Sequence, residues 1–261
     1  MTRETPPRAR LPYLDSPAPL AFAHRGGAAD GDENTAEAFA RAIALGYRYV
    51  ETDVHATADG VPVIFHDAAL DRLTGTAGRV ADLRWADLAT LRIGGAGAVP
   101  RLDEVLAAWP EVRFNIDVKS DAAAGPTVEV IRRGHAGDRV LLASFRDARL
   151  TRLRALAGPR VATSLARGEV LRLLISSRVG TPLRLPVSAV AAQVPPRRGR
   201  VPIVDRRFVS RAHRLGLQVH VWTIDDPVEM GRLLELGVDG IMTDRPEVLR
   251  EVYTTRGLPL S

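Results

Sequence analysis

The chain has 261 residues, a formal net charge of +5 and no cysteine. Without cysteine it can form neither disulfide bonds nor thiolate metal sites, so any metal ion must be held by oxygen or nitrogen ligands. No stretch of the sequence has the length and apolarity of a signal peptide or a membrane span. We therefore expect a cytoplasmic protein that does not insert stably into a membrane.

The positive net charge would suit a nucleic-acid partner, because Lys and Arg neutralise phosphates. The arginines are spread along the whole chain, however, and the one dense cluster is Arg197-Arg198-Gly199-Arg200. Few aromatic residues are available to stack on bases, and none is interleaved with that cluster. The sequence therefore predicts no nucleic-acid partner. Lys119 is the only lysine, which indicates a site that needs a compact point charge.

Short apolar strands alternate with helical patterns from Leu20 onward, as in a parallel sheet built from β-α units. The predicted strands are Leu20–His24, Tyr49–Val54, Arg113–Val118, Val140–Ser144, Val161–Ser164, Ala189–Gln193, Gln218–Trp222 and Gly240–Thr243. Eight units within about 250 residues predict a single-domain α/β fold, the closed (β/α)8 or TIM barrel. A doubly wound open sheet is the alternative. We place the domain at residues 20–256, after an N-terminal extension of residues 1–19.

The connections carry further local signals. Asn34 and Glu37, three residues apart, fit a capping box at a helix start. A β-hairpin is expected to return the chain after the second strand. Residues 68–112 form a helical excursion before the third barrel strand, with helices near residues 85–91 and 102–108.

The hairpin brings charged residues together. Asp59-Gly60 predicts a two-residue turn, and counting outward from it places Asp53 directly opposite His66. Opposed residues share a face, and strand alternation puts Glu51 and His55 on that same face. A strand with an acidic face inside a buried sheet favours a cation site.

Polar side chains also gather where the predicted strands end. These residues are His24 and Arg25; Glu51 and Asp53; Asn115, Asp117 and Lys119; Gln193; Trp222; and Thr243 with Asp244. In a (β/α)8 barrel the functional side chains lie at the carboxyl ends of several strands. The pattern therefore predicts a functional site at that end of the barrel.

Several motifs occur in a fixed order along the chain. They are His24-Arg25-Gly26, Glu33-Asn34-Thr35, Glu51-Thr52-Asp53-Val54, Asp59-Gly60, His66-Asp67, Asp117-Val118-Lys119, Trp222-Thr223 and Gly237-Val238-Asp239-Gly240-Ile241-Met242-Thr243-Asp244. This ordered set, from about residue 20 to about 250, resembles the glycerophosphodiester phosphodiesterase family. The resemblance implies a TIM-barrel enzyme with a divalent cation. Its substrates would be small-molecule glycerophosphodiesters, which it would hydrolyse to glycerol 3-phosphate and an alcohol.

The resemblance implies a metal site and an acid–base pair. Glu51, Asp53 and Asp117 are similar to the family's metal ligands, and their oxygens suit Mg²⁺ or Ca²⁺. His24 and His66 are similar to the general acid and base. In the mechanism that the family implies, one histidine activates a glycerol hydroxyl, which attacks phosphorus to give a cyclic phosphate. The other protonates the leaving alcohol, and water then opens the ring.

The resemblance also implies residues that bind the substrate. Arg25 and Lys119 are similar to the family's phosphate clamp. Glu33 is expected near the metal and phosphate, and it is assigned with Gln193 and Trp222 to the substrate pocket. A buried tryptophan on a barrel strand is as often a core residue as a ligand-binding one.

Two positions depart from the family pattern. Asp32 stands where a proline usually precedes Glu-Asn-Thr, so the loop after the first strand loses a rigid residue. Asp117 stands where the family more often has Glu, and the shorter side chain leaves both Mg²⁺ and Ca²⁺ compatible with the site.

Two other histidines have alternative explanations. His55 is either a further metal ligand or a core histidine bonded to a backbone carbonyl, and we favour the second. His220 is expected to lie deeper in the barrel as a core residue. Neither is assigned to catalysis.

Two other functions remain open from sequence. A lysophospholipase D-like enzyme would use the same residues on a lipid and would need an apolar groove at the barrel mouth. A non-catalytic phosphate- or nucleic-acid-binding barrel is a more distant alternative. The sequence predicts no particular oligomeric state.

Overall fold

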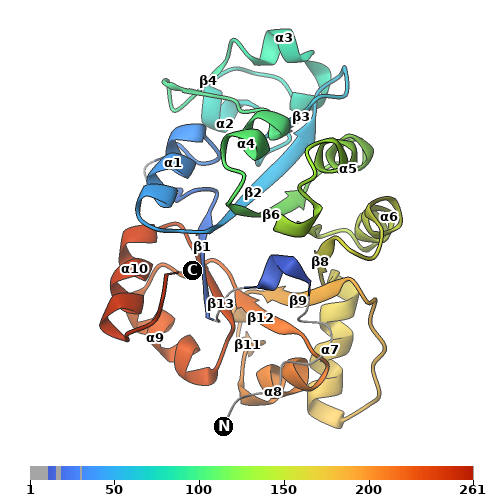
Figure 1. Ribbon diagram of the computed structural model, residues 1–261, viewed down its shortest axis with the longest axis vertical. Coiled ribbons are helices and arrows are strands. Elements are labelled where there is room, and N and C mark those ends of the chain that lie inside the picture. Colours follow the sequence, from blue (N-terminus) through green and yellow to red (C-terminus); the bar gives the residue numbers. More distant parts are fainter. Residues whose placement is uncertain (1–10, 16–18, 30, 261) are drawn as a thin grey trace.

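Eight parallel strands form a closed barrel in this computed structural model, which describes residues 11–15, 19–29 and 31–260 (Figure 1). In barrel order they are β1 (Leu20–His24), β2 (Tyr49–Ala56), β6 (Arg113–Val118), β7 (Val140–Ala143), β8 (Ala162–Ser164), β9 (Ala189–Val194), β12 (Gln218–Val221) and β13 (Gly240–Thr243). Strand β1 pairs in parallel with β13, where Leu20 lies opposite Gly240, and with β2, where Phe22 lies opposite Tyr49. Because the last strand pairs with the first, the sheet is closed. This confirms the predicted TIM barrel and excludes the doubly wound open sheet.

Helices surround the barrel on the outside (Figure 1). They are α1 (Ala36–Ala44), α4 (Leu102–Ala108), α5 (Ala124–Arg133), α6 (Asp147–Ala157), α7 (Arg167–Val179), α8 (Arg206–Arg214), α9 (Pro227–Leu236) and α10 (Pro246–Thr255). None of the helices in the described part of the chain is long and apolar enough to cross a bilayer. Each barrel strand is thus followed, directly or after the excursion, by a helix that covers its outer face.

The predicted excursion lies between β3 (Pro62–Ile64) and β6. It contains α2 (Asp71–Thr74), the 3-10 turn η3 (Val80–Asp82), α3 (Trp85–Leu88) and the small hairpin β4 (Arg92–Ile93) with β5 (Gly97–Ala98). The helix predicted near residues 85–91 therefore ends at Leu88, and the one predicted at residues 102–108 is confirmed as α4. In Figure 1 this excursion forms the end of the molecule beyond β2 and β3.

On the first two barrel strands the inward side chains change from apolar to polar along the strand. On β1, Leu20 and Phe22 are fully buried and His24 follows two residues later. On β2, Tyr49 is fully buried and Glu51 follows. Because alternate residues of a strand share a face, these side chains all point into the barrel. The amino-terminal half of the interior is therefore a packed core, and the carboxyl-terminal half holds the polar groups.

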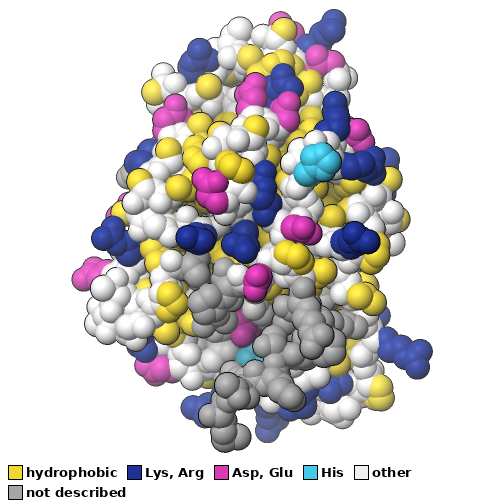
Figure 2. Space-filling model, in the orientation of Figure 1, with side chains coloured by type: hydrophobic (Ala, Val, Ile, Leu, Met, Phe, Trp, Pro, Cys, Tyr) yellow, Lys and Arg dark blue, Asp and Glu magenta, His cyan; other side chains and the backbone are white. Residues whose placement is uncertain are grey.

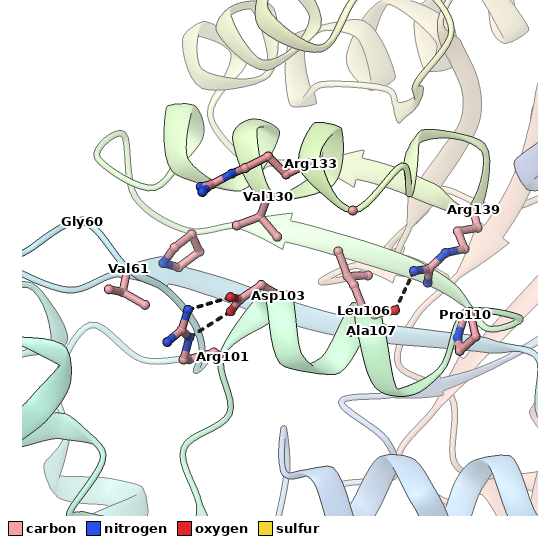
Figure 3. A pocket seen from close by; sticks show the side chains of 12 residues that line it. Gly60, Val61, Arg101, Asp103, Leu106, Ala107, Pro110, Val130, Arg133 and Arg139 are labelled. Carbon is pink, nitrogen blue, oxygen red and sulfur yellow. Dashed lines mark hydrogen bonds and ion pairs between the residues drawn. The ribbon is translucent and has the colours of Figure 1, made fainter.

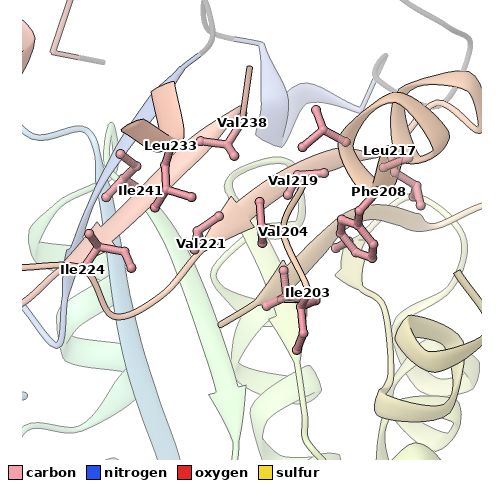
Figure 4. Close-up of a cluster of buried hydrophobic side chains, with 14 of the residues drawn as sticks. Ile203, Val204, Phe208, Leu217, Val219, Val221, Ile224, Leu233, Val238 and Ile241 are labelled. Atoms are coloured by element: carbon pink, nitrogen blue, oxygen red, sulfur yellow. The ribbon is translucent and has the colours of Figure 1, made fainter. Parts of the chain in front are cut away.

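The outward side chains form a second core beneath the helices (Figure 4). Figure 4 shows one part of it, between β12, β13 and the helices α8 and α9, with Ile203, Val204, Phe208, Leu217, Val219, Val221, Ile224, Leu233, Val238 and Ile241. Phe208 and Ile241 are completely buried. Burying one such side chain contributes roughly 1.5–3 kcal/mol, so this layer holds the helices on the barrel.

The register of the hairpin differs from the prediction. Val54 pairs with Ile64, and the Phe65 backbone N–H donates to the Asp53 carbonyl at 3.0 Å, so Asp53 faces Phe65 rather than His66. The Gly60 N–H donates to the Thr57 carbonyl at 3.0 Å, and Gly60 has φ of 81°. This is a three-residue loop with a left-handed glycine, one residue longer than the predicted turn. One extra loop residue shifts the pairing by one.

Part of the predicted N-terminal extension packs against the barrel. Tyr13 is buried, and its ring lies edge-on to Tyr49 with centroids 5.5 Å apart. The Tyr49 hydroxyl donates to the Tyr13 carbonyl at 2.8 Å. Since Tyr49 lies at the amino-terminal end of β2, this contact covers the end of the barrel opposite the polar residues.

Candidate active site

The register of the barrel sets polar residues of neighbouring strands side by side. His24 lies opposite Glu51 in the pairing of β1 with β2, and Asp53 lies opposite Asp117 in the pairing of β2 with β6. All three carboxylates are buried, with Lys119 directly after β6. The structure thus brings together the three predicted metal ligands, one predicted acid–base histidine and one half of the predicted phosphate clamp.

Two cations contact the carboxylates directly. Lys119 Nζ lies 2.8 Å from Asp53 Oδ1 and 2.7 Å from Asp117 Oδ2. Arg25 donates to Glu33 Oε1 at 2.8 Å, and its Nε lies 3.2 Å from Asp53 Oδ2. Burial alone would raise the pKa of Asp53, but the charges of Lys119 and Arg25 outweigh it and lower this pKa. Asp53 is therefore an ionised carboxylate between two cationic groups.

The other two carboxylates are harder to ionise. Burial and the neighbouring Asp53 charge raise the pKa of Glu51 to about 7. Burial also raises the pKa of Asp117, although Lys119 opposes this. Burial, the largest cause in both cases, therefore disfavours the ionised forms of Glu51 and Asp117.

Whether a divalent cation fits can be judged from the carboxylates themselves. Asp117 Oδ1 is buried and has no hydrogen-bond partner within the described residues. A free buried carboxylate oxygen beside two further carboxylates is a donor set that Mg²⁺ and Ca²⁺ prefer. Among the described residues no three such side chains already stand as a ready-made metal cluster, since Lys119 lies between Asp53 and Asp117. The three carboxylates are therefore ligands of the type that such a cation binds.

His24 is held by a carboxylate from the far end of the chain. Its Nδ1 donates to Asp244 Oδ1 at 2.6 Å, and its Nε2 lies 3.7 Å from Glu51 Oε2. Burial would lower the pKa of His24, but Glu51 and Asp244 outweigh burial and raise it. Asp244 N–H in turn donates to Asp225 Oδ1 at 2.8 Å. The imidazole is thereby oriented with Nε2 toward the carboxylates.

His66 is held by a local network that the sequence did not reveal. Its Nδ1 donates to Asp67 Oδ1 at 2.5 Å, and Arg72 binds Asp67 Oδ2 at 2.5 Å. Arg72 also donates to both oxygens of Glu33, at 2.9 and 2.7 Å. The bond from Arg72 lowers the pKa of Asp67 to about 2. Arg72 thus connects His66 to Glu33, which Arg25 binds from the other side.

His66 reaches the carboxylate cluster by another route than the predicted one. The strand β3 ends at Ile64, so His66 lies beyond the hairpin pairing. His66 is connected to the cluster through Asp67, Arg72 and Glu33. The predicted opposition of Asp53 and His66 is wrong, while the prediction that His66 belongs to this site is compatible with the structure.

The loop after β1 supplies an unexpected residue, Asn34. The sequence suggested Asn34 as a helix cap, but α1 begins at Ala36 and its cap is Thr35, whose side chain accepts from Ala38 N. Asn34 instead donates to Asp53 Oδ2 at 2.9 Å and accepts from Thr52 at 2.7 Å. Its φ is 62°, a left-handed conformation that asparagine tolerates. Asn34 therefore fixes the orientation of the Asp53 carboxylate.

The same loop directs the backbone of Arg25 at Glu51. Arg25 has φ of 53°, and its N–H donates to Glu51 Oε2 at 3.2 Å. Gly26 follows with φ of 81°, and a Cβ there would lie 2.7 Å from the ring of Phe39. The tight left-handed turn beneath α1 thus requires the glycine of His24-Arg25-Gly26.

The predicted pocket residues lie around this cluster. Gln193 donates to Asn115 Oδ1 at 3.2 Å, inside the barrel. Trp222 lies edge-on to Phe145, with centroids 5.5 Å apart. Phe145 is 50% exposed, and Lys119 Nζ lies 5.6 Å from the centre of its ring. The structure therefore adds Phe145, two residues beyond β7, to the rim of the site.

The two alternative histidines are core residues. His55 Nε2 donates to the His66 carbonyl at 3.1 Å, as we favoured from sequence. His220 is fully buried, accepts weakly from Gln193 at 3.4 Å and donates to Gln218 Oε1 at 2.8 Å. Burial lowers the pKa of His220 to about 4, so it is a neutral structural residue.

A separate groove of about 520 Å³ lies outside the barrel between α4 and α5 (Figure 3). Figure 3 shows that two of its arginines are already bound, Arg101 to Asp103 and Arg139 to the Leu106 carbonyl of α4. None of the predicted site residues lines it. The groove is therefore distinct from the polar end of the barrel.

The fold and the site together define a class of protein. Two imidazoles, each bound by a carboxylate through Nδ1, flank buried carboxylates at the carboxyl-terminal end of a (β/α)8 barrel. Arg25 and Lys119 add positive charge beside them. This is a barrel enzyme equipped for acid–base chemistry on an anionic substrate.

Comparison with known proteins agrees with this class. Residues 24–248 match the glycerophosphoryl diester phosphodiesterase family. The chain is 41% identical over 242 residues to the probable glycerophosphodiester phosphodiesterase 2 of Mycobacterium tuberculosis, across 91% of this chain and 92% of that one. It is 26% identical over 275 residues to a lysophospholipase D of Rattus norvegicus, across 88% and 84% of the two chains.

Solved structures show the same fold. The crystal structure of a glycerophosphodiester phosphodiesterase from Agrobacterium tumefaciens aligns with a TM-score of 0.74 at 24% identity, across 90% of this chain and 99% of that one. With the family match, the assignment is clear. The chain belongs to the glycerophosphoryl diester phosphodiesterase family, as its motifs predicted, and it is a phosphoric diester hydrolase by homology.

Proposed function

We propose that this protein hydrolyses glycerophosphodiesters to glycerol 3-phosphate and an alcohol, with His24 and His66 as the acid–base pair. The observation that carries the proposal is that each imidazole is bound through Nδ1 by its own carboxylate, Asp244 or Asp67, beside one carboxylate cluster. A histidine held in this way presents Nε2 for proton transfer.

The residues that would hold a divalent cation are Glu51, Asp53 and Asp117. Their fit rests on the unpartnered Asp117 Oδ1 and on the raised pKa of the buried Glu51. When bound, such a cation supplies Lewis-acid polarisation of a phosphoryl oxygen. Asn34 keeps the Asp53 carboxylate oriented. We propose Mg²⁺ or Ca²⁺, because all three ligands are oxygens.

Lys119 and Arg25 supply the positive charge that a phosphate requires. Lys119 is partly buried and protonated, since the Asp53 and Asp117 charges outweigh burial and raise its pKa. Arg25 binds Glu33 and Asp53, so its guanidinium lies within the same cluster. Both cations stabilise negative charge that builds on phosphoryl oxygens during substitution at phosphorus.

The proton transfers follow from the two histidines. One imidazole takes the proton of the neighbouring glycerol hydroxyl as the hydroxyl oxygen forms a bond to phosphorus. The other gives a proton to the alcohol oxygen as its bond to phosphorus breaks, which leaves a cyclic phosphate. Water then opens the ring with the proton roles reversed, so both imidazoles return to their starting state.

A lysophospholipase D activity is the second candidate, and the exposed Phe145 favours it. Phe145 and Trp222 place aromatic surface at the rim of the site, where an apolar chain of a lipid could lie. The rat relative carries the name of that activity. The chemistry at phosphorus is the same for both substrate classes.

The test is a turnover assay of the metal-stripped protein, with each cation added back. Glycerophosphodiesters, lysophospholipids and bis(p-nitrophenyl) phosphate are compared for the wild type, His24→Ala and His66→Ala. We expect turnover of glycerophosphodiesters that needs added Mg²⁺ or Ca²⁺ and both histidines. Wild-type rates in either variant would refute the acid–base assignment, and turnover confined to lysophospholipids would select the second candidate.

A further inference from the structure

Helix α7 has a second apolar face, opposite the one that packs on the barrel. Its inner side buries Leu173 completely. Its outer side carries Leu171, Ile175 and Val179, which are 56, 49 and 67% exposed. The spacing of four residues places these three side chains in one row along the helix. A row of large exposed apolar side chains is unusual on a free surface and marks an interaction site.

Arginines border this row on both sides. At 100° per residue, Arg167 and Arg178 lie along one edge of the row and Arg172 along the other. All three are exposed. The only carboxylate of α7, Glu169, is buried and accepts from Arg154 at 2.8 Å. Helix α7 itself therefore exposes three arginines and no carboxylate, and of the three Arg178 is paired with Asp205, which precedes α8.

The neighbouring helix α8 extends the positive surface. It packs beside α7 (Figure 1), where Arg211 donates to Ser176 at 2.9 Å and Arg178 lies 2.8 Å from Asp205. The two helices hold seven arginines, three on α7 and four on α8. In the view of Figure 2, Lys and Arg side chains are scattered over the surface with acidic side chains among them.

We propose that this α7–α8 face, made of the row Leu171, Ile175, Val179 and the arginines around it, binds the surface of an anionic phospholipid membrane. The apolar row would enter the headgroup region, and the arginines would contact lipid phosphates. Binding of this kind is peripheral and reversible. It does not depend on the proposed hydrolysis, and it would keep the protein where lipid-derived diesters are released.

Charge distinguishes a membrane surface from two other partners, a second copy of the chain and a nucleic acid. If a second copy packed its α7 antiparallel across Ile175, the two copies of Arg172 would share one edge of the contact and the two copies of Arg178 the other, so like charges would gather along both edges. A nucleic acid would use the arginines, but it would leave the apolar row facing phosphates and sugars. An anionic membrane surface alone satisfies both the row and its borders.

The test is sedimentation of the full-length protein with lipid vesicles. Vesicles of phosphatidylcholine alone are compared with an equimolar mixture of phosphatidylcholine and phosphatidylglycerol, at 50 and 500 mM NaCl. We expect binding to the mixed vesicles only, weakened by salt. The pair Leu171→Gln with Ile175→Gln, and separately Arg172→Glu, should each weaken binding about tenfold or more.

Two matched variants control for charge and apolarity. Arg250→Glu makes the same charge change on α10, and Val228→Gln removes the 78% exposed valine of α9. Both should bind as the wild type does, and circular dichroism and turnover should show that every variant is folded. The proposal is overturned if the wild type does not bind the mixed vesicles, or if the α7 variants bind them unchanged. It is also overturned if sedimentation of the protein without vesicles shows a dimer, and if the double variant Leu171→Gln with Ile175→Gln is a monomer.

Discussion

The two histidines of the site are held in the same way but placed in different surroundings. His24 ends a barrel strand, its side chain is 15% exposed, and its carboxylate partner Asp244 comes from the other end of the chain. His66 follows the hairpin, its side chain is 30% exposed, and its partner Asp67 is the next residue. Barrel closure fixes the first dyad, and a local network fixes the second.

The difference separates two ways of controlling an imidazole. His24 lies among buried charges, so substitutions of its neighbours should act on its pKa and proton transfer. His66 depends on Arg72, which holds Asp67 and Glu33 at once and is 47% exposed. Substitutions around His66 should therefore act mainly on how well the side chain is ordered.

Removing either imidazole should give the largest effect. His24→Ala and His66→Ala are each expected to lower kcat roughly 10²- to 10⁴-fold, because proton transfer is lost while the barrel stays folded. Steady-state turnover of a glycerophosphodiester measures this. His135→Asn, at an exposed left-handed position, is the control and should leave kcat unchanged. A loss at only one histidine would mean that the two do not act as a pair.

Removing the carboxylate partners should separate the two dyads. Asp244→Asn is expected to lower kcat about 100-fold, and Asp67→Asn only about tenfold. The reason is that the His24 side chain is less exposed than that of His66, so water replaces its lost partner less readily. The ratio of the two kcat values is the measurement. Equal losses would show that burial does not distinguish the dyads.

The pKa of His24 should depend on Glu51. Burial lowers this pKa and the Glu51 charge does most to raise it, so Glu51→Gln should lower the pKa of His24. Because the pKa of His24 is higher in the folded protein than in the unfolded chain, protonated His24 stabilises the fold below about pH 6.5. This contribution to the free energy of unfolding is lost as the pH rises through the pKa of the folded protein. An NMR titration of the His24 ring protons in metal-free protein tests it. An unchanged or higher pKa in the variant would contradict the assignment.

Weakening Arg72 should have the smallest effect. Arg72→Lys keeps the charge but cannot bind both Glu33 oxygens and Asp67 together, so kcat should fall about threefold and become more sensitive to salt. Assays at 50 and 500 mM NaCl measure both changes. Arg132→Lys, which keeps an exposed charge near Glu129 on α5, is the matched control. A loss as large as that of His66→Ala would place Arg72 in the chemistry itself.

The barrel was predictable because its signals are periodic. Each strand is an apolar run followed by a polar residue, and parallel strands bring those residues to one end whatever the helices do. The hairpin register was not predictable, because Asp59-Gly60 fits both a two-residue and a three-residue loop. The choice depends on bonds made by Thr57 and Gly60, which adjacent residue types do not specify.

The site was predictable where residues follow strands and was missed where loops supply them. Glu51, Asp53 and Asp117 lie on strands, and their proximity follows from register. Arg72 lies on a four-residue helix in the excursion, which has no periodicity to interpret. Asn34 looked like a helix cap because asparagine favours both caps and left-handed turns. Phe145 could have been found, since it follows a barrel strand as the other site residues do.

Lys119 has a practical consequence for observing this site. It is the only lysine in the chain, so an amine-selective reagent has one side-chain target, and that target lies between Asp53 and Asp117. The α-amine of the N-terminus reacts as well, so mass spectrometry of the proteolytic peptide that holds Lys119, rather than of the intact protein, would measure modification of the site. Protection of Lys119 by a bound phosphate ester or a divalent cation would then report binding without any engineered reporter residue.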